Sequence, residues 1–171
     1  IAAHMSAVSE LIPPTEKSFL FNGYSLSADQ NVDFYVDFLY GKYPTPNWRE
    51  RVVCPISKLN NRNRYADFII DTYAGILSSD KIYIMEQTTA FYMHLRSKYK
   101  NTIGSEFISP KLTSGYINPE NILHQDATKL SFEDETFKAV LSFDVLEHIP
   151  DYLTALKETY RVLERGGKLI F

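Results

Sequence analysis

From Lys81 onward, short apolar runs alternate with longer stretches whose apolar residues recur at helical spacing. Runs of the first kind are typical of buried strands, and stretches of the second kind are typical of amphipathic helices. Strands that alternate with helices form a parallel sheet, because each helix returns the chain over the sheet in a right-handed crossover. The pattern therefore predicts an α/β fold with a Rossmann-like, doubly wound parallel sheet. Its expected strands are 82–85, 101–107, 122–124, 139–143 and 167–171, and its expected helices are 90–99 and 151–164.

The residues ahead of this pattern form an N-terminal extension, placed at 6–78, before the Rossmann-like domain at 79–171. The extension is rich in aromatic residues, so we expect helical or irregular structure that serves as a lid or an interface. Helices are expected at 29–40 and 65–77. Residues 1–5 read as a tag remnant.

One part of the extension, residues 49–64, is basic and contains a single acidic residue, Glu50. Its arginines could bind phosphate or carboxylate, or they could pack against an acidic rim of the other domain. The same segment contains Cys54-Pro55-Ile56-Ser57, which is similar to a Cys-x-x-Cys metal pair whose second thiol is lost. With one cysteine and four histidines in the whole chain, no metal site is expected.

Charge and composition narrow the choice of partners and compartment. The net charge is −3, which argues against a chain that coats nucleic acid or an anionic membrane. No apolar run approaches the ~20 residues of a membrane span, and no signal peptide is recognisable, so a cytoplasmic protein is expected. The lone cysteine cannot form an internal disulfide. We expect a small-molecule substrate and allow for a homodimer.

Acidic residues follow four successive predicted strands: Glu86, Glu106, Asp126 and Asp144, which lie 20, 20 and 18 residues apart. The carboxyl ends of parallel strands meet at one edge of a sheet, and ligands of doubly wound folds bind there. A carboxylate after the second strand can accept both hydrogen bonds of a ribose diol, and Asp126 could accept from an exocyclic amine such as that of adenine. The competing interpretation is a set of ordinary helix caps and solvated loop residues.

Three segments, 124–132, 137–149 and 160–167, resemble class I S-adenosylmethionine-dependent methyltransferases. The resemblance implies S-adenosylmethionine as the cofactor and a sheet with strand order 3-2-1-4-5. It also implies two further strands, so we expect the natural protein to continue past Phe171, with residues 169–171 on an open sheet edge. Roles carried over from the family are ribose binding for Glu106, adenine contacts for Asp126 and Ala127, the lip of the cofactor pocket for Asp144 and Val145, and a position facing the methyl acceptor for His148.

The first loop departs from the family pattern, in which an acidic residue is followed by alternating glycines. Here the acid, Glu86, is kept, but Gln87-Thr88-Thr89-Ala90 contains no glycine. Side chains at these positions could narrow the pocket, because glycine lets backbone N–H groups approach a ligand without a Cβ in the way. Alternatively, the hydroxyls of Thr88 and Thr89 and the following helix N-terminus could hold the cofactor's carboxylate.

The resemblance favours methylation of a small-molecule or glycan-like acceptor. His148 is the candidate general base, because histidine exchanges protons near neutral pH. A cap or surface role for His148 is the alternative. Two other functions stay open: a non-catalytic module that keeps the fold for protein contacts, and an enzyme that binds NAD or a nucleotide sugar. The missing glycines argue against binding of S-adenosylmethionine. They argue even more strongly against the pyrophosphate of NAD or a nucleotide sugar.

Overall fold

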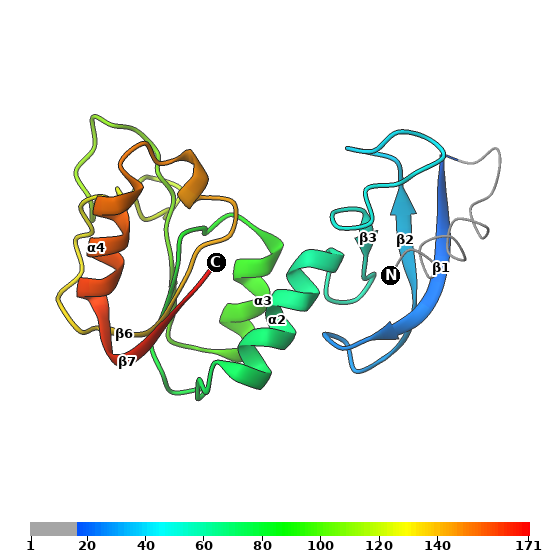
Figure 1. The fold of residues 1–171 in the computed structure, drawn as a ribbon, viewed down its shortest axis with the longest axis horizontal. Helices are drawn as coiled ribbons and strands as arrows, with labels where there is room; N and C mark the ends of the chain where they lie inside the picture. Colours follow the sequence, from blue (N-terminus) through cyan, green and yellow to red (C-terminus); the bar gives the residue numbers. More distant parts are fainter. Residues whose placement is uncertain (1–16) are drawn as a thin grey trace. The chain divides into compact units, whose positions relative to one another are not determined.

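The computed structural model describes residues 17–171, which separate into two compact units. The first unit ends at Ile70 and the second begins at Asp71. Helix α2 (Asn61–Tyr73) contains this boundary and begins four residues before the predicted helix 65–77. The proposed tag remnant at 1–5 and the start of the extension lie outside the described residues. Figure 1 shows the elements of each unit in sequence colours.

The first unit contains a three-stranded antiparallel sheet in the order β1-β2-β3, formed by β1 (Ser18–Ser25), β2 (Gln30–Asp37) and β3 (Val52–Val53). The prediction of a helix at 29–40 is therefore wrong, and the extension contains an antiparallel sheet in addition to the helix α2. In β2 the side chains of Val32, Phe34 and Val36 are buried, while the residues between them are exposed. This alternation has the period of a strand, and aromatic and β-branched residues favour that structure.

The arginines of the basic segment are held by contacts within the first unit. Arg51 makes a bidentate ion pair with Asp37, which lowers the pKa of that carboxyl. Arg49 and Arg62 both pair with Glu50. The buried guanidinium of Arg64 lies 4.3 Å from the Phe34 ring centroid and donates to the carbonyls of Val52 and Leu59. These contacts give the four arginines a part in holding the unit together.

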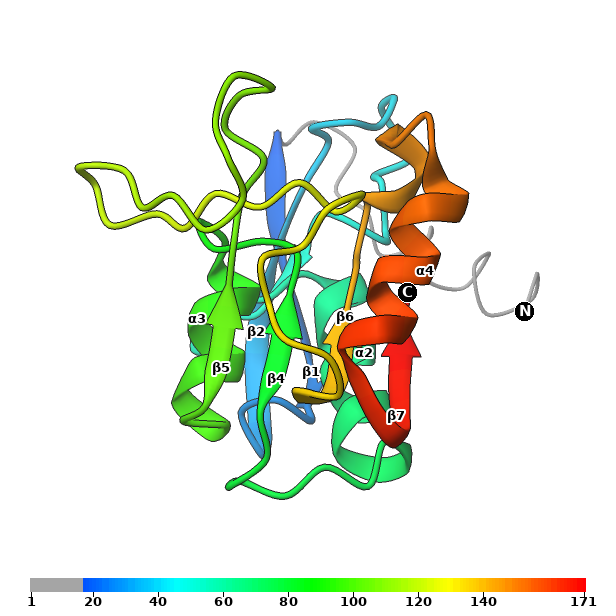
Figure 2. The ribbon, with the colours of Figure 1, turned by 90° about the vertical axis from the view of Figure 1, so that its left-hand side faces the viewer.

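The second unit is built on a parallel sheet in the order β5-β4-β6-β7, with β4 (Ile82–Ile84) and β6 (Phe137–Leu141) at its centre. Strand β5 (Thr102–Gly104) lies at one edge and β7 (Leu163–Ile170) at the other. Helices α3 (Ala90–Lys98) and α4 (Tyr152–Val162) cover opposite faces of the sheet (Figures 1 and 2). The predicted α/β, Rossmann-like, doubly wound fold is confirmed.

The predicted third strand, 122–124, is reduced to a single parallel bridge between Glu106 and His124. Glu106 lies two residues past the end of β5, within the second predicted strand. The segment 122–124 therefore lies beside that strand. The strand order is therefore 3-2-1-4-5, as the resemblance implied. Within the described residues, β7 pairs with β6 alone and forms the edge that was expected at 169–171.

Helix boundaries follow local capping. The Oγ1 of Thr89 accepts from the backbone N–H of Tyr92 and caps α3, and Asp151 caps α4 by accepting from the N–H of Thr154. Helix α4 ends at Val162 and passes directly into β7. The predicted helix 151–164 therefore ends two residues early, and Gly166 lies inside the strand with a φ of 76°.

One glycine is required by the packing beneath the first loop. A Cβ on Gly104, at the end of β5, would lie 2.5 Å from the carbonyl oxygen of Glu86 and 2.6 Å from the Tyr92 ring. Contacts this short are essentially absent between real atoms, so the backbone of β5 can approach the loop after β4 only without a side chain there. The close approach matters for the site, because it brings together the residues that follow these two strands.

Arg161 of α4 joins the helix to the segment that leads from the third strand position back to β6. Its guanidinium donates to both carboxylate oxygens of Glu158 and to the backbone carbonyls of Leu130 and Phe132. It also pairs with Asp134. Phe132 packs in turn on Tyr83 and Phe137, with ring centroids 4.9 Å away in each case. Arg161 therefore anchors a loop that supports the core.

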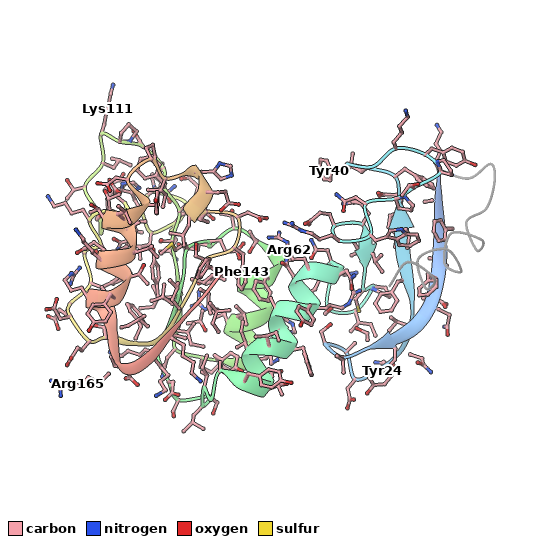
Figure 3. The ribbon with its side chains drawn as sticks, viewed as in Figure 1. Tyr24, Tyr40, Arg62, Lys111, Phe143 and Arg165 are labelled. Carbon is pink, nitrogen blue, oxygen red and sulfur yellow. The ribbon has the colours of Figure 1, made fainter. Side chains whose placement is uncertain are left out.

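We expect Arg161→Met to lower the free energy of unfolding by about 2 kcal/mol, because carbonyls and a carboxylate lose a charged donor while the aliphatic packing is kept. Arg165→Met is the matched control, since this side chain is 94% exposed and its single ion pair, to Glu135, is 3.5 Å long (Figure 3). The control should change stability by less than about 0.5 kcal/mol. Urea unfolding measures both, and equal effects would contradict the anchoring role.

The contact between Arg161 and Glu158 also predicts that the free energy of unfolding depends on pH. Hydrogen bonding to Arg161 lowers the pKa of Glu158 below its usual 4.5. Folding therefore favours the ionised carboxylate, and the stabilisation is complete above pH 4.5 and is lost as the pH falls through the pKa of the folded state. Arg161→Met should flatten this part of the stability profile, which urea unfolding between about pH 3 and pH 6 would measure.

Candidate functional site

A cavity of about 500 Å³ lies where β4, β5 and β6 end. Its size is that of a typical small-molecule site, and its position is the one that ligands occupy in doubly wound sheets. Six of the eight residues predicted for the site line it together: Glu106, Asp126, Ala127, Asp144, Val145 and His148. Glu86 and Thr88 are not among the lining residues, although Thr88 contacts one of them.

The Glu106 carboxylate is fixed by the first loop. Its Oε1 atom accepts from the backbone N–H groups of Gln87 and Thr88 at 2.8 and 2.9 Å, and from the Thr88 hydroxyl at 2.9 Å. Thr88 thus holds Glu106, while the Thr89 hydroxyl is used as the cap of α3. Three donors on one oxygen leave Oε2 as the atom that this carboxylate can offer to a ligand.

The wall formed by 125–128 is held by short-range contacts. The Oδ1 atom of Asp126 accepts from both the backbone N–H and the hydroxyl of Thr128, and the N–H of Asp126 donates to Ser114. Gln125 is buried, and its side chain bonds to Ser131. Asp126 therefore keeps a fixed orientation at the cavity, with its second carboxylate oxygen outside the Thr128 contacts.

The opposite wall is the connection from β6 to α4. Asp144 has a φ of 54°, in the left-handed region that few residues other than glycine, asparagine and aspartate enter. The short helix η1 (Leu146–His148) follows, and the His148 N–H donates to the Val145 carbonyl. The His148 side chain is exposed, which places it at the mouth of the cavity. It is therefore accessible to a ligand that enters from solvent.

The charges around the cavity have one sign. Among its lining residues, Glu106, Asp126, Asp144 and Asp151 carry carboxylates, and none is lysine or arginine. The apolar part of the lining includes Met85, Phe107, Ile149 and Pro150. A lining of this kind favours ligands that are cationic or neutral and that carry an apolar ring system.

Sequence reasoning missed several lining residues: Tyr83, Met85, Ser105, Phe107, Gln125, Thr128, Ile149, Pro150 and Asp151. Four of them, Met85, Ser105, Phe107 and Gln125, adjoin a predicted acidic residue, so the flanks of each strand end were the available signal. Tyr83 was read only as part of a buried strand. Its hydroxyl lies 2.7 Å from the Ser105 hydroxyl, and burial raises the pKa of Tyr83 above the ordinary value of tyrosine.

Within residues 17–171, no three histidine, cysteine, aspartate or glutamate side chains are grouped closely enough to hold a metal ion. Cys54 is buried in the first unit. Burial acts to raise the pKa of its thiol, but hydrogen bonds from Ser25 and Ser57 outweigh it and lower the pKa to about 7. Separately, none of the helices in the described part of the chain has the length and apolar character that crossing a membrane requires.

A parallel sheet in the order 3-2-1-4-5, with an acid-lined cavity at its carboxyl edge, defines a Rossmann-like domain. Comparison with known families then narrows the class. Residues 88–171 match the family of methyltransferase domains. These residues, about half of the chain, therefore form a domain of the methyltransferase-domain family.

Curated relatives are similar over a shorter stretch. A demethylmenaquinone methyltransferase from Bacillus pumilus (strain SAFR-032) is 45% identical over 60 residues, and that from Bacillus subtilis (strain 168) is 40% identical over 60 residues. Each match covers 35% of this chain and 26% of the relative. The chain therefore spans about a quarter of the length of these relatives.

Solved structures also resemble the chain. A protein assigned as a methyltransferase from Bacillus halodurans C-125 gives a TM-score of 0.46 at 19% identity, covering 58% of this chain and 42% of its own. The methyltransferase CalH, solved as a complex with S-adenosylhomocysteine, gives a TM-score of 0.42 at 16% identity, covering 64% of this chain and 38% of its own.

Proposed function

We propose that this chain binds S-adenosylmethionine in the cavity at the carboxyl edge of its sheet and transfers the methyl group to a small-molecule acceptor. The observation that carries the proposal is the convergence of Glu106, Asp126 and His148 on one cavity from three different strand ends. The match of residues 88–171 to the family of methyltransferase domains supports it.

The residues present fit the cofactor. Glu106 would hold the ribose diol through Oε2, because its Oε1 is already used by the first loop. Asp126 would accept from the adenine amine through the oxygen that Thr128 does not use. The carboxylates of the lining suit a cofactor that carries a positive charge at sulfur and at its amino group.

When bound, S-adenosylmethionine supplies an electrophilic methyl group, and the protein's main task is to align an acceptor with it. His148 lies at the mouth of the cavity and can take a proton from an acceptor hydroxyl or amine. Ile149 and Pro150, next to it in the lining, would exclude water from the reacting atoms. The chain's residues therefore divide into a cofactor-holding set and a set at the mouth.

For the acceptor, we favour an apolar ring that carries a hydroxyl or amine over a glycan. Phe107, Ile149 and Pro150 offer an apolar surface, and the surrounding carboxylates disfavour acceptors with phosphate or carboxylate groups. Demethylmenaquinone methyltransferases, by their name, act on a quinone-type compound, which is consistent with an acceptor that contains an apolar ring.

Titration calorimetry with S-adenosylmethionine and S-adenosylhomocysteine tests cofactor binding directly, and we expect saturable binding of both. Methyl transfer would then be assayed with phenols, aromatic amines and matched ring compounds that carry carboxylate or phosphate. Transfer to the first two groups alone is the expected pattern. Transfer only to the anionic compounds would overturn the acceptor class.

A non-catalytic module is the second candidate. It is favoured by one observation: the loop that is glycine-rich in the family here directs two of its N–H groups to Glu106. A folded protein that binds neither cofactor nor product in the calorimeter would favour this candidate and contradict the first.

A further inference from the structure

Three strand ends at the candidate site are joined by a closed ring of hydrogen bonds. The backbone N–H of Gln87, after β4, donates to the carboxylate of Glu106, after β5, at 2.8 Å. The backbone N–H of Glu106 donates to the carbonyl of Leu123 at 2.9 Å. The N–H of Leu123 donates to the side-chain Oε1 of Gln87 at 2.8 Å, which closes the ring.

The Gln87 side chain uses both ends of its amide in this ring. Its Nε2 donates to the carbonyl of Asn121 at 2.8 Å while its Oε1 accepts from Leu123. The receiving segment is itself an ordered turn, in which the N–H of Asn118 donates to the carbonyl of Ile122, the N–H of Ile122 donates to the side-chain Oδ1 of Asn118, and Asn121 adopts a left-handed φ of 61°. The side-chain amide of Gln87 therefore joins the loop after β4 to an ordered turn.

The ring reaches the residues that would hold the cofactor. Glu106 is a member of the ring, and the N–H of Gln125 donates to the Glu106 carbonyl at 3.1 Å. Asp126 is the next residue, so the ribose and adenine sides of the proposed site are connected through backbone groups that Gln87 fixes. In a glycine-containing loop, the flexible backbone lets N–H groups turn toward a ligand. In this loop, the hydrogen bonds of the Gln87 side chain hold the backbone in position instead.

We propose that Gln87 is a positioning residue for the cofactor, which holds the Glu106 carboxylate and the 121–126 segment in the geometry that binding needs. The inference rests on the proposed function, since it concerns the same site. Gln87 does not line the cavity, so its effect on a ligand passes through Glu106 and Leu123. A residue of this kind should change cofactor affinity and leave the proton-transfer step alone.

The first variant is Gln87→Met, which keeps the length of the side chain and removes both of its hydrogen bonds. We expect affinity for S-adenosylhomocysteine to fall about tenfold, the effect of losing two neutral hydrogen bonds that preorganise a site. Gln87→Glu keeps the acceptor for Leu123 and loses the donor to Asn121, so it should recover part of the affinity. Glu120→Ala is the matched control, an exposed side chain in the same turn that should leave affinity unchanged.

Two readouts separate positioning from general destabilisation. Amide hydrogen exchange in the ligand-free protein should show that Gln87→Met speeds exchange at Leu123 while leaving the core of β6 protected. In a double-mutant cycle, Gln87→Met should cause little further loss of affinity in a Glu106→Ala background, because both changes break the same ring.

The outcomes are distinct from those that judge the proposed function. If the wild-type protein binds S-adenosylhomocysteine but Gln87→Met and Gln87→Glu bind it equally well, the inference is overturned and the proposed function stands. Fully additive losses with Glu106→Ala would also overturn it. If the wild-type protein binds no cofactor, the proposed function is wrong. Unaltered amide exchange at Leu123 in Gln87→Met would then show that Gln87 does not hold this segment either.

Discussion

Glu106→Ala should weaken binding of S-adenosylhomocysteine by between about 1.5 and 3 kcal/mol, or roughly tenfold to more than a hundredfold. Two losses combine in this variant. The ribose loses a charged acceptor, and the N–H groups of Gln87 and Thr88 lose the carboxylate that now fixes the first loop. Titration calorimetry measures the change, with circular dichroism to show that the fold is kept.

Two further variants sharpen this prediction. Glu106→Gln keeps one oxygen acceptor for the Thr88 hydroxyl and should show an intermediate affinity. Glu133→Ala removes an exposed carboxylate that is not part of the cavity lining, and it should bind as the wild type does. Unchanged affinity in Glu106→Ala would rule out the ribose-binding role of this residue.

His148→Ala should lower turnover about a hundredfold, the usual size of a general-base contribution, with affinity for S-adenosylhomocysteine kept within about twofold. The reason is geometric: His148 lies at the mouth of the cavity, whereas Glu106 and Asp126 would hold the cofactor from the other walls. Turnover would be measured with whichever acceptor the ring-compound assay identifies, and affinity by calorimetry.

The neighbouring Glu147→Ala is the control for His148→Ala. This side chain is exposed on the same short helix and does not line the cavity, so both turnover and affinity should be unaffected. Parallel losses of turnover and affinity in His148→Ala would indicate a structural role for the histidine. No loss of either would remove it from the mechanism.

The second unit could be predicted from sequence because its signals are local. Strands β4 and β6 are continuous apolar runs, and Thr89 and Asp151 cap helices at the positions where their chemistry suggests. The helix predicted at 29–40 was wrong because Val32 and Val36, four residues apart, fit one face of a strand as well as one face of a helix. Pairing of β2 with β1 and β3, which is a tertiary contact, decided between the two.

The candidate site shows the same division. The acidic residues after each strand could be found from spacing alone, and the fold brings Glu106, Asp126 and Asp144 to one cavity. The role of Gln87 could not be found in this way. Its two partners, Asn121 and Leu123, lie 34 and 36 residues further along the chain, and the contacts exist only once the sheet has formed.

The junction between α4 and β7 sets how the site can open. Because the helix passes into the strand at Leu163 with no loop between them, α4 cannot swing or slide without pulling an eight-residue strand out of its pairing with β6. The connection from Asp144 to Asp151 has no such restraint, since it contains only one short helical turn. If a ligand enters or leaves the cavity, we therefore expect any displacement to occur in this connection, because its C-terminal end is held by α4 and, through α4, by β7.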